Sequence, residues 1–259
     1  TGYGIPAHKK LKNELGSKIV WESIKDIPTV GVIRQDVQRK IIDIAWPMGV
    51  IAALTPSTNP TSTAMYKALS AVKARNAIVF APHPSAVRCT FETCRLMQQA
   101  AEKAGAPHGL VGCMQHISLQ GTQELMRHKY IRLILATGGS AMVKAAHSVG
   151  KPAYGVGPGN VPVYVDRSAD LQKAARYIVA SKAFDCSTIC ATEQAVVADK
   201  PIAGELERLM QAEGAYFTDD YQTELLRKML FHPDGTINTA VVGKPAQTVA
   251  GMAGFSIPQ

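Results

Sequence analysis

Short apolar segments alternate with amphipathic segments along most of this chain, and the alternation predicts its fold. The apolar segments have strand length, and turn residues follow them. Strands are predicted at 49–54, 77–81, 110–114, 132–137, 153–156 and 161–165. Helices are predicted at 60–75, 84–104, 121–128, 140–149 and from Asp166 or Ser168 to about residue 183. Strands alternating with helices imply right-handed crossovers, so the chain is expected to be an α/β protein with a parallel sheet covered by helices on both faces.

The regions that flank this alternation follow different patterns. Residues 1–28 read as an irregular entry, and two bridging strands are expected within 27–46. A second unit begins after the small-residue loop near residue 186. Its predicted elements are strands at 195–198 and 239–242 and helices at 202–213, 220–230 and 247–253. These elements cannot cover both faces of a sheet, so we expect domains at 1–185 and 186–259, the second of them incomplete.

Composition excludes several classes of protein. The chain is 46% hydrophobic, which provides a substantial core, and no apolar run reaches the roughly 18–20 residues that span a bilayer. No signal-peptide pattern is visible at the start. The net charge of +8 lies on scattered Lys and Arg, which favours a solvated basic surface over a nucleic-acid site and would attract phosphorylated cofactors. Five irregularly spaced cysteines indicate a reducing compartment and hence a cytoplasmic protein.

Cys190 is the strongest candidate for a nucleophile. It lies in a loop of small residues, 186–192, directly before an apolar strand. A cysteine reacts as its thiolate, so it needs partial exposure and a polarising backbone, and such a loop can supply both. A buried structural cysteine is the alternative, because free cysteine is among the most buried residue types.

Three turns that follow predicted strands are candidates for binding a ligand. Thr137-Gly138-Gly139-Ser140 opens a helix whose N-terminus favours an anion such as a pyrophosphate, and Gly155-x-Gly157-x-Gly159 follows the next strand. Neither has the spacing of the dinucleotide fingerprint, and a plain tight turn is the alternative for both. In the third turn, Thr58 or Asn59 can donate to a developing oxyanion together with the backbone N–H of Cys190. An ordinary helix cap is the alternative there.

Histidines and cysteines do not form a recognisable metal site. Cys186 and Cys190 lack the spacing of zinc ligands, and the candidates within 108–116 lack a fourth ligand. Cys89 and Cys94 lie five residues apart on a predicted helix and do not share a face well, so we expect them to pack in the core. No metal is therefore predicted.

Five motifs, taken in order, resemble those of the CoA-acylating aldehyde dehydrogenases. They are GVIAALTPSTNPTST at 49–63, RNAIVFAPHP at 75–84, LATGG at 135–139, GKPAYGVGPGN at 150–160 and ICATEQ at 189–194. That family includes the aldehyde dehydrogenase half of bifunctional alcohol/aldehyde dehydrogenases and the aldehyde dehydrogenases of bacterial microcompartments. The motifs are collinear and cover most of the chain, so together they are far more specific than any one of them.

The resemblance implies an NAD(P)-dependent enzyme that oxidises an aldehyde to an acyl-CoA. It implies a Rossmann-like cofactor domain followed by the start of a catalytic domain. Cys190 would add to the aldehyde to give a thiohemiacetal, and coenzyme A would attack the thioester that oxidation leaves. Asn59 would stabilise the oxyanion, or Thr58 if the register differs by one residue. The residues implied at the cofactor are Pro56, Thr137, Gly138, Gly139, Ser140, Gly155 and Gly157.

Two departures from related sequences bear on the chemistry. Hydrolytic aldehyde dehydrogenases carry a water-activating Glu in the strand before the second glycine turn, whereas Tyr154-Gly155-Val156 contains no carboxylate. Without such a base, the intrinsically nucleophilic thiol of coenzyme A is the expected acceptor. Family members often have Asn-Gly where this chain has Cys186-Ser187, which places a second thiol near the first.

The resemblance also implies the protein's partners. A small aldehyde is the expected substrate, a homo-oligomer the expected assembly, and a bacterial microcompartment one location within the cytoplasm. Neither a nucleic acid nor a membrane is expected as a partner. The family's fold extends before Thr1 and well beyond Gln259, so the chain is interpreted as a partial one. A hydrolytic or acyl-phosphate-reducing relative and a non-catalytic cofactor-binding or assembly module are the alternatives.

Overall fold

The computed structural model describes residues 1–258, and these form two compact units. The first unit consists of Lys10–Pro158 with Thr1, and the second joins Gly2–Lys9 to the chain from Gly159 onward. The predicted boundary after residue 185 concerns the domains of the whole protein and stays a prediction. Within residues 1–258, no helix has the length and apolar character needed to cross a membrane.

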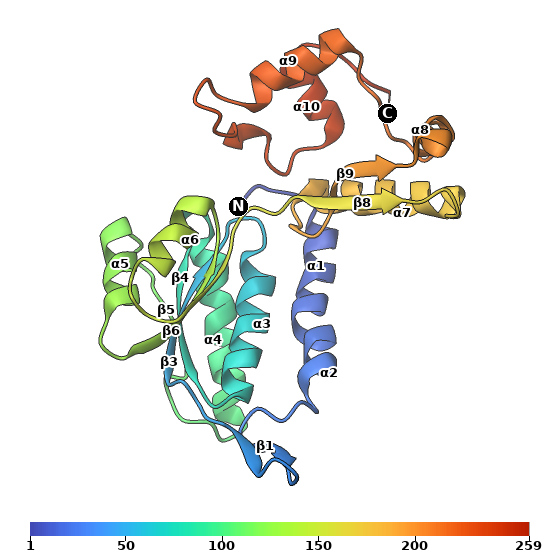
Figure 1. Cartoon of the computed structure of the whole chain (residues 1–259). Helices are drawn as coiled ribbons and strands as arrows, with labels where there is room; N and C mark the ends of the chain where they lie inside the picture. Colours follow the sequence, from blue (N-terminus) through green and yellow to red (C-terminus); the bar gives the residue numbers. More distant parts are fainter. Residues whose placement is uncertain (259) are drawn as a thin grey trace. The chain divides into compact units, whose positions relative to one another are not determined.

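A five-stranded parallel sheet forms the centre of the first unit and confirms the predicted α/β fold. Its order is β5-β4-β3-β6-β7, with every neighbouring pair parallel (Figure 1). The strands are β3 (Val50–Thr55), β4 (Ala77–Pro82), β5 (Val111–Cys113), β6 (Ile131–Thr137) and β7 (Ala153–Val156). The order reverses direction at β3 and β6. In an open parallel sheet, the carboxyl ends at such a switch point form the usual ligand site.

Helices cover both faces of this sheet. Figure 1 shows α3 (Pro60–Lys73) and α4 (Val87–Lys103) on one side and α5 (Leu119–Arg127) and α6 (Ser140–His147) on the other. Alternating residues of β3 pack into two buried clusters, one on each face of the sheet, because successive side chains of a strand point to opposite faces. Ile51 and Ala53 lie in one buried cluster with residues of α3 and α4, and Ala52 and Leu54 lie in the other. Burial on both faces explains why the strands are apolar throughout.

The N-terminal segment is helical, so the prediction of an irregular entry is wrong. It comprises α1 (Pro6–Glu14), a π-helical turn η1 (Leu15–Ile19) and α2 (Val20–Ile24). Gly16 allows the π-helical turn to pack tightly on α3, because a Cβ at this position would lie 2.7 Å from the Ser62 carbonyl oxygen. The expected strand pair follows as an antiparallel hairpin of β1 (Gly31–Asp36) and β2 (Ile41–Ala45).

In the second unit, a pair of parallel strands packs on helices. β8 (Val161–Val165) pairs with β9 (Glu193–Ala198), and its Val165 forms a buried apolar cluster with residues of α7 (Leu171–Ala183) and α8 (Ala203–Ala212). The N-cap of α7 is Asp170, and not Asp166 or Ser168 as predicted. Asp170 accepts from the Lys173 N–H at 3.0 Å, whereas Asp166 binds Ser168 in a turn of its own.

The last helices of the chain are α9 (Asp220–Leu230) and α10 (Ala246–Ala253), both close to their predicted positions. The strand predicted at 239–242 is wrong. Thr239–Val241 forms a 3-10 turn instead, and the Asn238 side chain accepts from the Ala240 N–H at 3.1 Å. The short apolar run that suggested a strand therefore belongs to a capped turn, a local side-chain effect that hydrophobic periodicity does not detect.

Candidate active site

Cys190 lies in an exposed turn of the second unit, between a short 3-10 helix η3 (Phe184–Ser187) and β9. The turn is closed by the Thr192 hydroxyl, which donates to the Ile189 carbonyl at 3.0 Å. Gly159 lies close to it, since a Cβ there would be 3.2 Å from the Cys190 carbonyl oxygen. The exposure of Cys190 contradicts the alternative of a buried structural cysteine and meets the first requirement for a nucleophile.

Asp185 anchors the loop that carries Cys190. Its side chain is fully buried, with 0% exposed. One carboxylate oxygen accepts from the Ile5 N–H at 2.7 Å, and the other accepts from the Thr188 hydroxyl at 2.6 Å and lies 2.7 Å from Lys9 Nζ. A buried carboxylate is tolerated only when it is paired and hydrogen-bonded, and this network supplies both. Sequence reasoning missed Asp185, because Ile5 and Lys9 lie far from it along the chain.

The backbone of η3 is held in an unusual conformation. Asp185, Cys186 and Ser187 have φ angles of 52°, 51° and 58°, so three successive residues other than glycine occupy the left-handed region. Such residues cost about 1–2 kcal/mol each, with Asp among the better tolerated. The conformation persists because the surroundings hold it, including the Asp185 N–H, which donates to His8 Nδ1 at 2.9 Å. The imidazole ring of His8 also stacks on Phe184, with ring centroids 4.4 Å apart.

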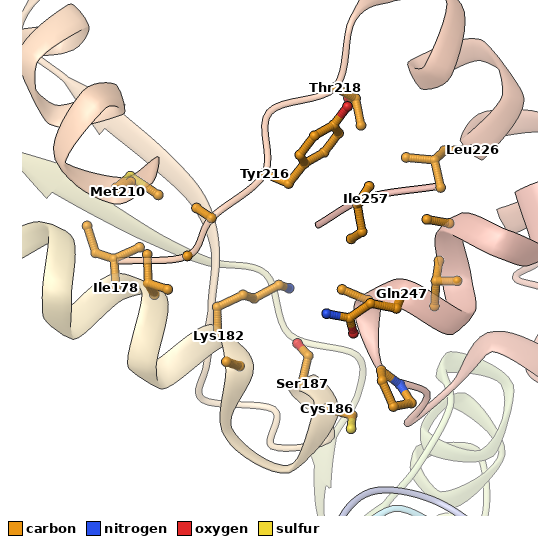
Figure 2. A pocket seen from close by; sticks show the side chains of 18 of the residues that line it. Ile178, Lys182, Cys186, Ser187, Met210, Tyr216, Thr218, Leu226, Gln247 and Ile257 are labelled. Carbon is orange, nitrogen blue, oxygen red and sulfur yellow. The ribbon is translucent and has the colours of Figure 1, made fainter. Parts of the chain in front are cut away.

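The second thiol of the loop, Cys186, lines a cavity of about 950 Å³ within the second unit, and Cys190 is absent from its lining. Figure 2 shows Lys182 and Gln247 extending toward each other across this cavity, with Ser187 and Cys186 at its edge. Burial, together with the nearby Asp185 carboxylate, raises the pKa of Cys186. Cys186 is therefore the less reactive thiol of a pair whose other member is exposed.

The Thr137–Ser140 turn of the first unit leaves room for a ligand. It joins β6 to α6 at the sheet's carboxyl edge, and Gly139 is the residue that precedes the helix. Neither Gly138 nor Gly139 has a positive φ, and a Cβ at Gly139 would meet no atom of the described residues within 4 Å. Internal packing and backbone conformation thus do not require glycine at 139, whereas a closely approaching pyrophosphate would.

Gly155 and Gly157 differ in their surroundings. A Cβ at Gly155 would lie 2.4 Å from Cγ1 of Val143 and 2.7 Å from Nε2 of His147, so the packing of α6 on β7 requires glycine there. The same space could not accept the carboxylate side chain of a hydrolytic relative without moving α6. A Cβ at Gly157 would meet nothing within 4 Å in the described structure. Direct contact of either glycine with a cofactor stays a prediction.

Asn59 precedes the first residue of α3, but its side chain does not cap the helix. Its Oδ1 instead accepts from Nζ of Lys12, a residue that is only 5% exposed, and its Nδ2 lies 3.4 Å from the Thr58 hydroxyl. A lysine donates only, so it fixes the amide with its oxygen toward Lys12 and its N–H groups on the other side. An amide held this way is suited to donating to an oxyanion, and Lys12 is a residue that sequence reasoning missed.

Lys67 lies beneath the switch point of the sheet. Its Nζ donates to the carbonyl oxygens of Leu54 on β3 and Leu135 on β6, both at 2.9 Å, and its side chain is 2% exposed. Burial lowers the pKa of Lys67 to about 7. The lysine joins the carboxyl ends of two adjacent strands just before the turns that carry Asn59 and Gly138. No sequence signal marked it, because a lysine inside an amphipathic helix reads as a solvated residue.

The end of β3 also contains a buried polar atom that lacks a protein partner. Thr55 Oγ1 is inaccessible to solvent and makes no hydrogen bond with any residue in 1–258. Pro56 follows it directly and opens the turn that leads to Asn59. Buried hydroxyls are nearly always satisfied, so an orphan at the carboxyl edge of the sheet fits the predicted site, which a bound group would complete. The open space at Gly139 and the N-terminus of α6 fit the same interpretation.

Comparison with known proteins identifies the family of the chain. The sequence profile of the aldehyde dehydrogenase family matches residues 19–218. The chain belongs to the aldehyde dehydrogenase family. Among curated relatives, it is 42% identical over 259 residues to the bifunctional aldehyde-alcohol dehydrogenase of Escherichia coli (strain K12). That match covers the whole of this chain and 29% of the relative, so the chain spans less than a third of that protein's length.

Solved structures of the family show the same fold. An acetylating aldehyde dehydrogenase from Geobacillus thermoglucosidasius has a TM-score of 0.94 and 51% identity, and the match covers all of this chain and 57% of that one. A propionaldehyde dehydrogenase from Rhodopseudomonas palustris, described with bound CoA and an acylated cysteine, has a TM-score of 0.86 and 33% identity. That match covers all of this chain and 58% of the solved chain.

Proposed function

We propose that the protein oxidises an aldehyde to an acyl-CoA, using NAD(P)+ and coenzyme A. The observation that carries this proposal is the exposed Cys190 in its anchored loop, within a chain of the aldehyde dehydrogenase family. The solved propionaldehyde dehydrogenase, 33% identical, supports it, because that protein is described with bound CoA and an acylated cysteine.

In the proposed reaction, the Cys190 thiolate attacks the aldehyde carbon to form a thiohemiacetal. The former carbonyl oxygen of the aldehyde gains negative charge as the carbon–sulfur bond forms. The Asn59 amide, oriented by Lys12, is the proposed donor to that oxygen. Oxidation leaves an acyl thioester on Cys190. The thiolate of coenzyme A then attacks the thioester carbonyl, which forms acyl-CoA and releases the Cys190 thiolate.

The carboxyl edge of the sheet in the first unit is the proposed cofactor site. When bound, NAD(P)+ supplies the two-electron oxidation by accepting a hydride. The backbone N–H groups of Gly138, Gly139 and Ser140 at the start of α6 are suited to the pyrophosphate, since a helix N-terminus favours an anion. The orphan hydroxyl of Thr55 and the adjacent Pro56 extend this edge along β3.

Gly155 supports coenzyme A, and not water, as the acyl acceptor. A hydrolytic enzyme needs a carboxylate to raise the nucleophilicity of water, and the crowded space at Gly155 holds none. A thiol needs no such activation, because it ionises near neutral pH and is intrinsically nucleophilic. A CoA ester is therefore the proposed product, with release of free acid as the competing outcome.

The experiment supplies the protein with acetaldehyde, coenzyme A and NAD+ and follows NADH by absorbance and acyl-CoA by mass spectrometry. Cys190→Ala should abolish both products, while Cys186→Ala, the matched control, should retain them. Intact-mass measurement with aldehyde and NAD+, but without coenzyme A, should show an acyl adduct that depends on Cys190. Aldehyde-dependent NADH formation that survives Cys190→Ala, or free acid formed without coenzyme A, would refute the mechanism.

The identity of the aldehyde, a homo-oligomeric state, a cytoplasmic location and association with a bacterial microcompartment stay predictions from the family. Short unbranched aldehydes are the first substrates to test. Kinetic comparison of acetaldehyde, propionaldehyde and succinate semialdehyde addresses the acyl group, and sedimentation addresses the assembly.

A further inference from the structure

Two cysteines outside the candidate active site lie on neighbouring elements at the edge of the sheet in the first unit. Cys94 lies on α4 and is 2% exposed, while Cys113 is the last residue of β5 and is partly buried. Cys113 packs against the same apolar cluster that contains Cys94. Both cysteines line the same hollow, and each shifts the pKa of the other.

This interaction makes the two thiols chemically unequal. The hydrogen bond to Cys113, together with burial, raises the pKa of Cys94, so this residue keeps its proton. The hydrogen bond that Cys94 donates holds the pKa of Cys113 below its usual range. Cys113 therefore ionises first, and only the thiolate form of a cysteine reacts readily with an oxidant.

A small oxidant has a route to this pair. Cys94 and Cys113 line a hollow of about 340 Å³, and Arg95, Gln98 and His108 line it as well. A hollow of this size, with polar side chains among its lining residues, admits a molecule as small as hydrogen peroxide. The side chain of His108 is 92% exposed, which shows that the rim of the hollow reaches solvent.

We propose that Cys94 and Cys113 form a redox-sensitive dithiol that closes reversibly to a disulfide when the protein meets a hydroperoxide. The Cys113 thiolate attacks one peroxide oxygen, the O–O bond breaks, and a sulfenic acid forms as water leaves with a solvent proton. The sulfur of Cys94 then attacks the sulfenic sulfur. An S–S bond forms, the S–O bond breaks, and the Cys94 proton leaves with the hydroxide as a second water. Overall, two thiols lose two hydrogens and one peroxide becomes two waters.

The disulfide would tie the helix α4 to the edge strand β5. All five cysteines are free thiols in the structure, which is the resting form expected in a reducing compartment. Cys89 serves as an internal comparison, because it lies on the same helix but directs its thiol to the Ala86 carbonyl at 3.2 Å. This inference concerns residues that the proposed catalytic chemistry does not use, so the two proposals stand or fall separately.

Non-reducing peptide mapping of the intact, folded chain tests the proposal. The protein is treated with hydrogen peroxide, the remaining thiols are alkylated, and chains of single-chain mass are digested with trypsin. Residues 89–95 should be linked to residues 104–127, with a loss of two hydrogens, and dithiothreitol should release both peptides as free thiols. The link should persist in Cys89→Ser and disappear in Cys94→Ala.

Three results would overturn the inference. One is wild-type protein in which Cys113 stays alkylatable after peroxide treatment. Another is Cys113 that proceeds to sulfinic acid without any link to residues 89–95. The third is a link that survives Cys94→Ala, since it would assign Cys89 as the partner. The wild-type measurement does not depend on whether a variant folds, so a destabilised Cys94→Ala leaves the first two results decisive.

Discussion

Lys9 Nζ lies 2.7 Å from the carboxylate of Asp185, and this ion pair joins the first helix of the chain to the loop that carries Cys190. The carboxylate is fully buried, while the lysine side chain is 23% exposed. Because Asp185 also accepts from the Ile5 N–H and the Thr188 hydroxyl, one side chain fixes both the loop and the segment beside it. The left-handed backbone of residues 185–187 depends on this anchor.

Replacement of Asp185 by Asn should show how much the anchor contributes. The amide keeps the shape but removes the buried negative charge beside Lys9, so we expect a loss of about 2–4 kcal/mol in the free energy of unfolding. Urea unfolding measures it, with Lys9→Met and the double variant completing a double-mutant cycle. The alkylation rate of Cys190 should also change. A loss below about 0.5 kcal/mol, typical of surface sites, would show that the anchor is not needed.

Ser187→Gly should stabilise the protein. Ser187 has a φ of 58°, which glycine adopts without the steric cost that a Cβ brings. The gain is partly offset by the greater freedom of glycine in the unfolded chain, so we expect up to about 1 kcal/mol. Ser187→Val is the opposing control and should destabilise, because a branched side chain is disfavoured in this region. Thermal unfolding compares wild type, Ser187→Gly and Ser187→Val. Equal midpoint temperatures would show that the backbone at Ser187 is not strained.

Lys12→Met tests the orientation of Asn59. The lysine holds the amide oxygen, so its loss should let the amide turn and weaken its donation to the oxyanion. We expect kcat to fall about tenfold, less than the effect of deleting an oxyanion donor outright. Lys10→Met, at an exposed position of the same helix, is the control and should leave kcat unchanged. Equal kcat values for the two variants would show that Lys12 does not orient Asn59 for catalysis.

Lys67 should make stability depend on pH. Its folded pKa of about 7 lies below the unfolded value near 10.5, so between these values the unfolded chain binds more protons. Stability should therefore rise with pH from 7 toward 10, by at most about 1.4 kcal/mol per pH unit. Urea unfolding at several pH values should show this slope in wild type and in Lys73→Met but not in Lys67→Met. A wild-type slope that Lys67→Met retains would assign the titration to another group.

Gly155→Ala should destabilise the first unit, because the added Cβ would lie 2.4 Å from a methyl group of Val143. We expect a loss of about 1–3 kcal/mol, as for other overpacked sites. Gly157→Ala is the matched control, since a Cβ there meets nothing within 4 Å in residues 1–258. Gly155→Glu should likewise lose stability without gaining hydrolysis of the thioester. A stable Gly155→Glu variant that releases free acid would contradict this account.

The order of strands and helices could be predicted from sequence, because apolar runs of strand length and helical spacing report local burial directly. Cys190 and the glycine turns were also recognisable, since their residue types are tied to their chemistry. The N-terminal helix was missed, although Leu11, Leu15 and Ile19 recur at helical spacing. These side chains are 51%, 49% and 57% exposed, and a Gly-Ser pair interrupts the segment.

The supporting residues could not be predicted, for a different reason. Asp185, Lys12 and Lys67 owe their roles to partners that only the fold brings near. Lys67, for example, binds the carbonyls of Leu54 and Leu135, which belong to strands that are neighbours in the sheet but not in the chain. Backbone carbonyls leave no trace in residue identity, so a sequence pattern cannot reveal such a bond.

The second unit is built from two segments that lie far apart in the chain, and this has a consequence for synthesis on the ribosome. Residues 2–9 are synthesised before the rest of their unit, which begins at Gly159. At ordinary elongation rates, the early segment waits on the order of ten seconds before Asp185 is available. The loop that carries Cys190 thus cannot reach its anchored form until the residues of the first unit have been made.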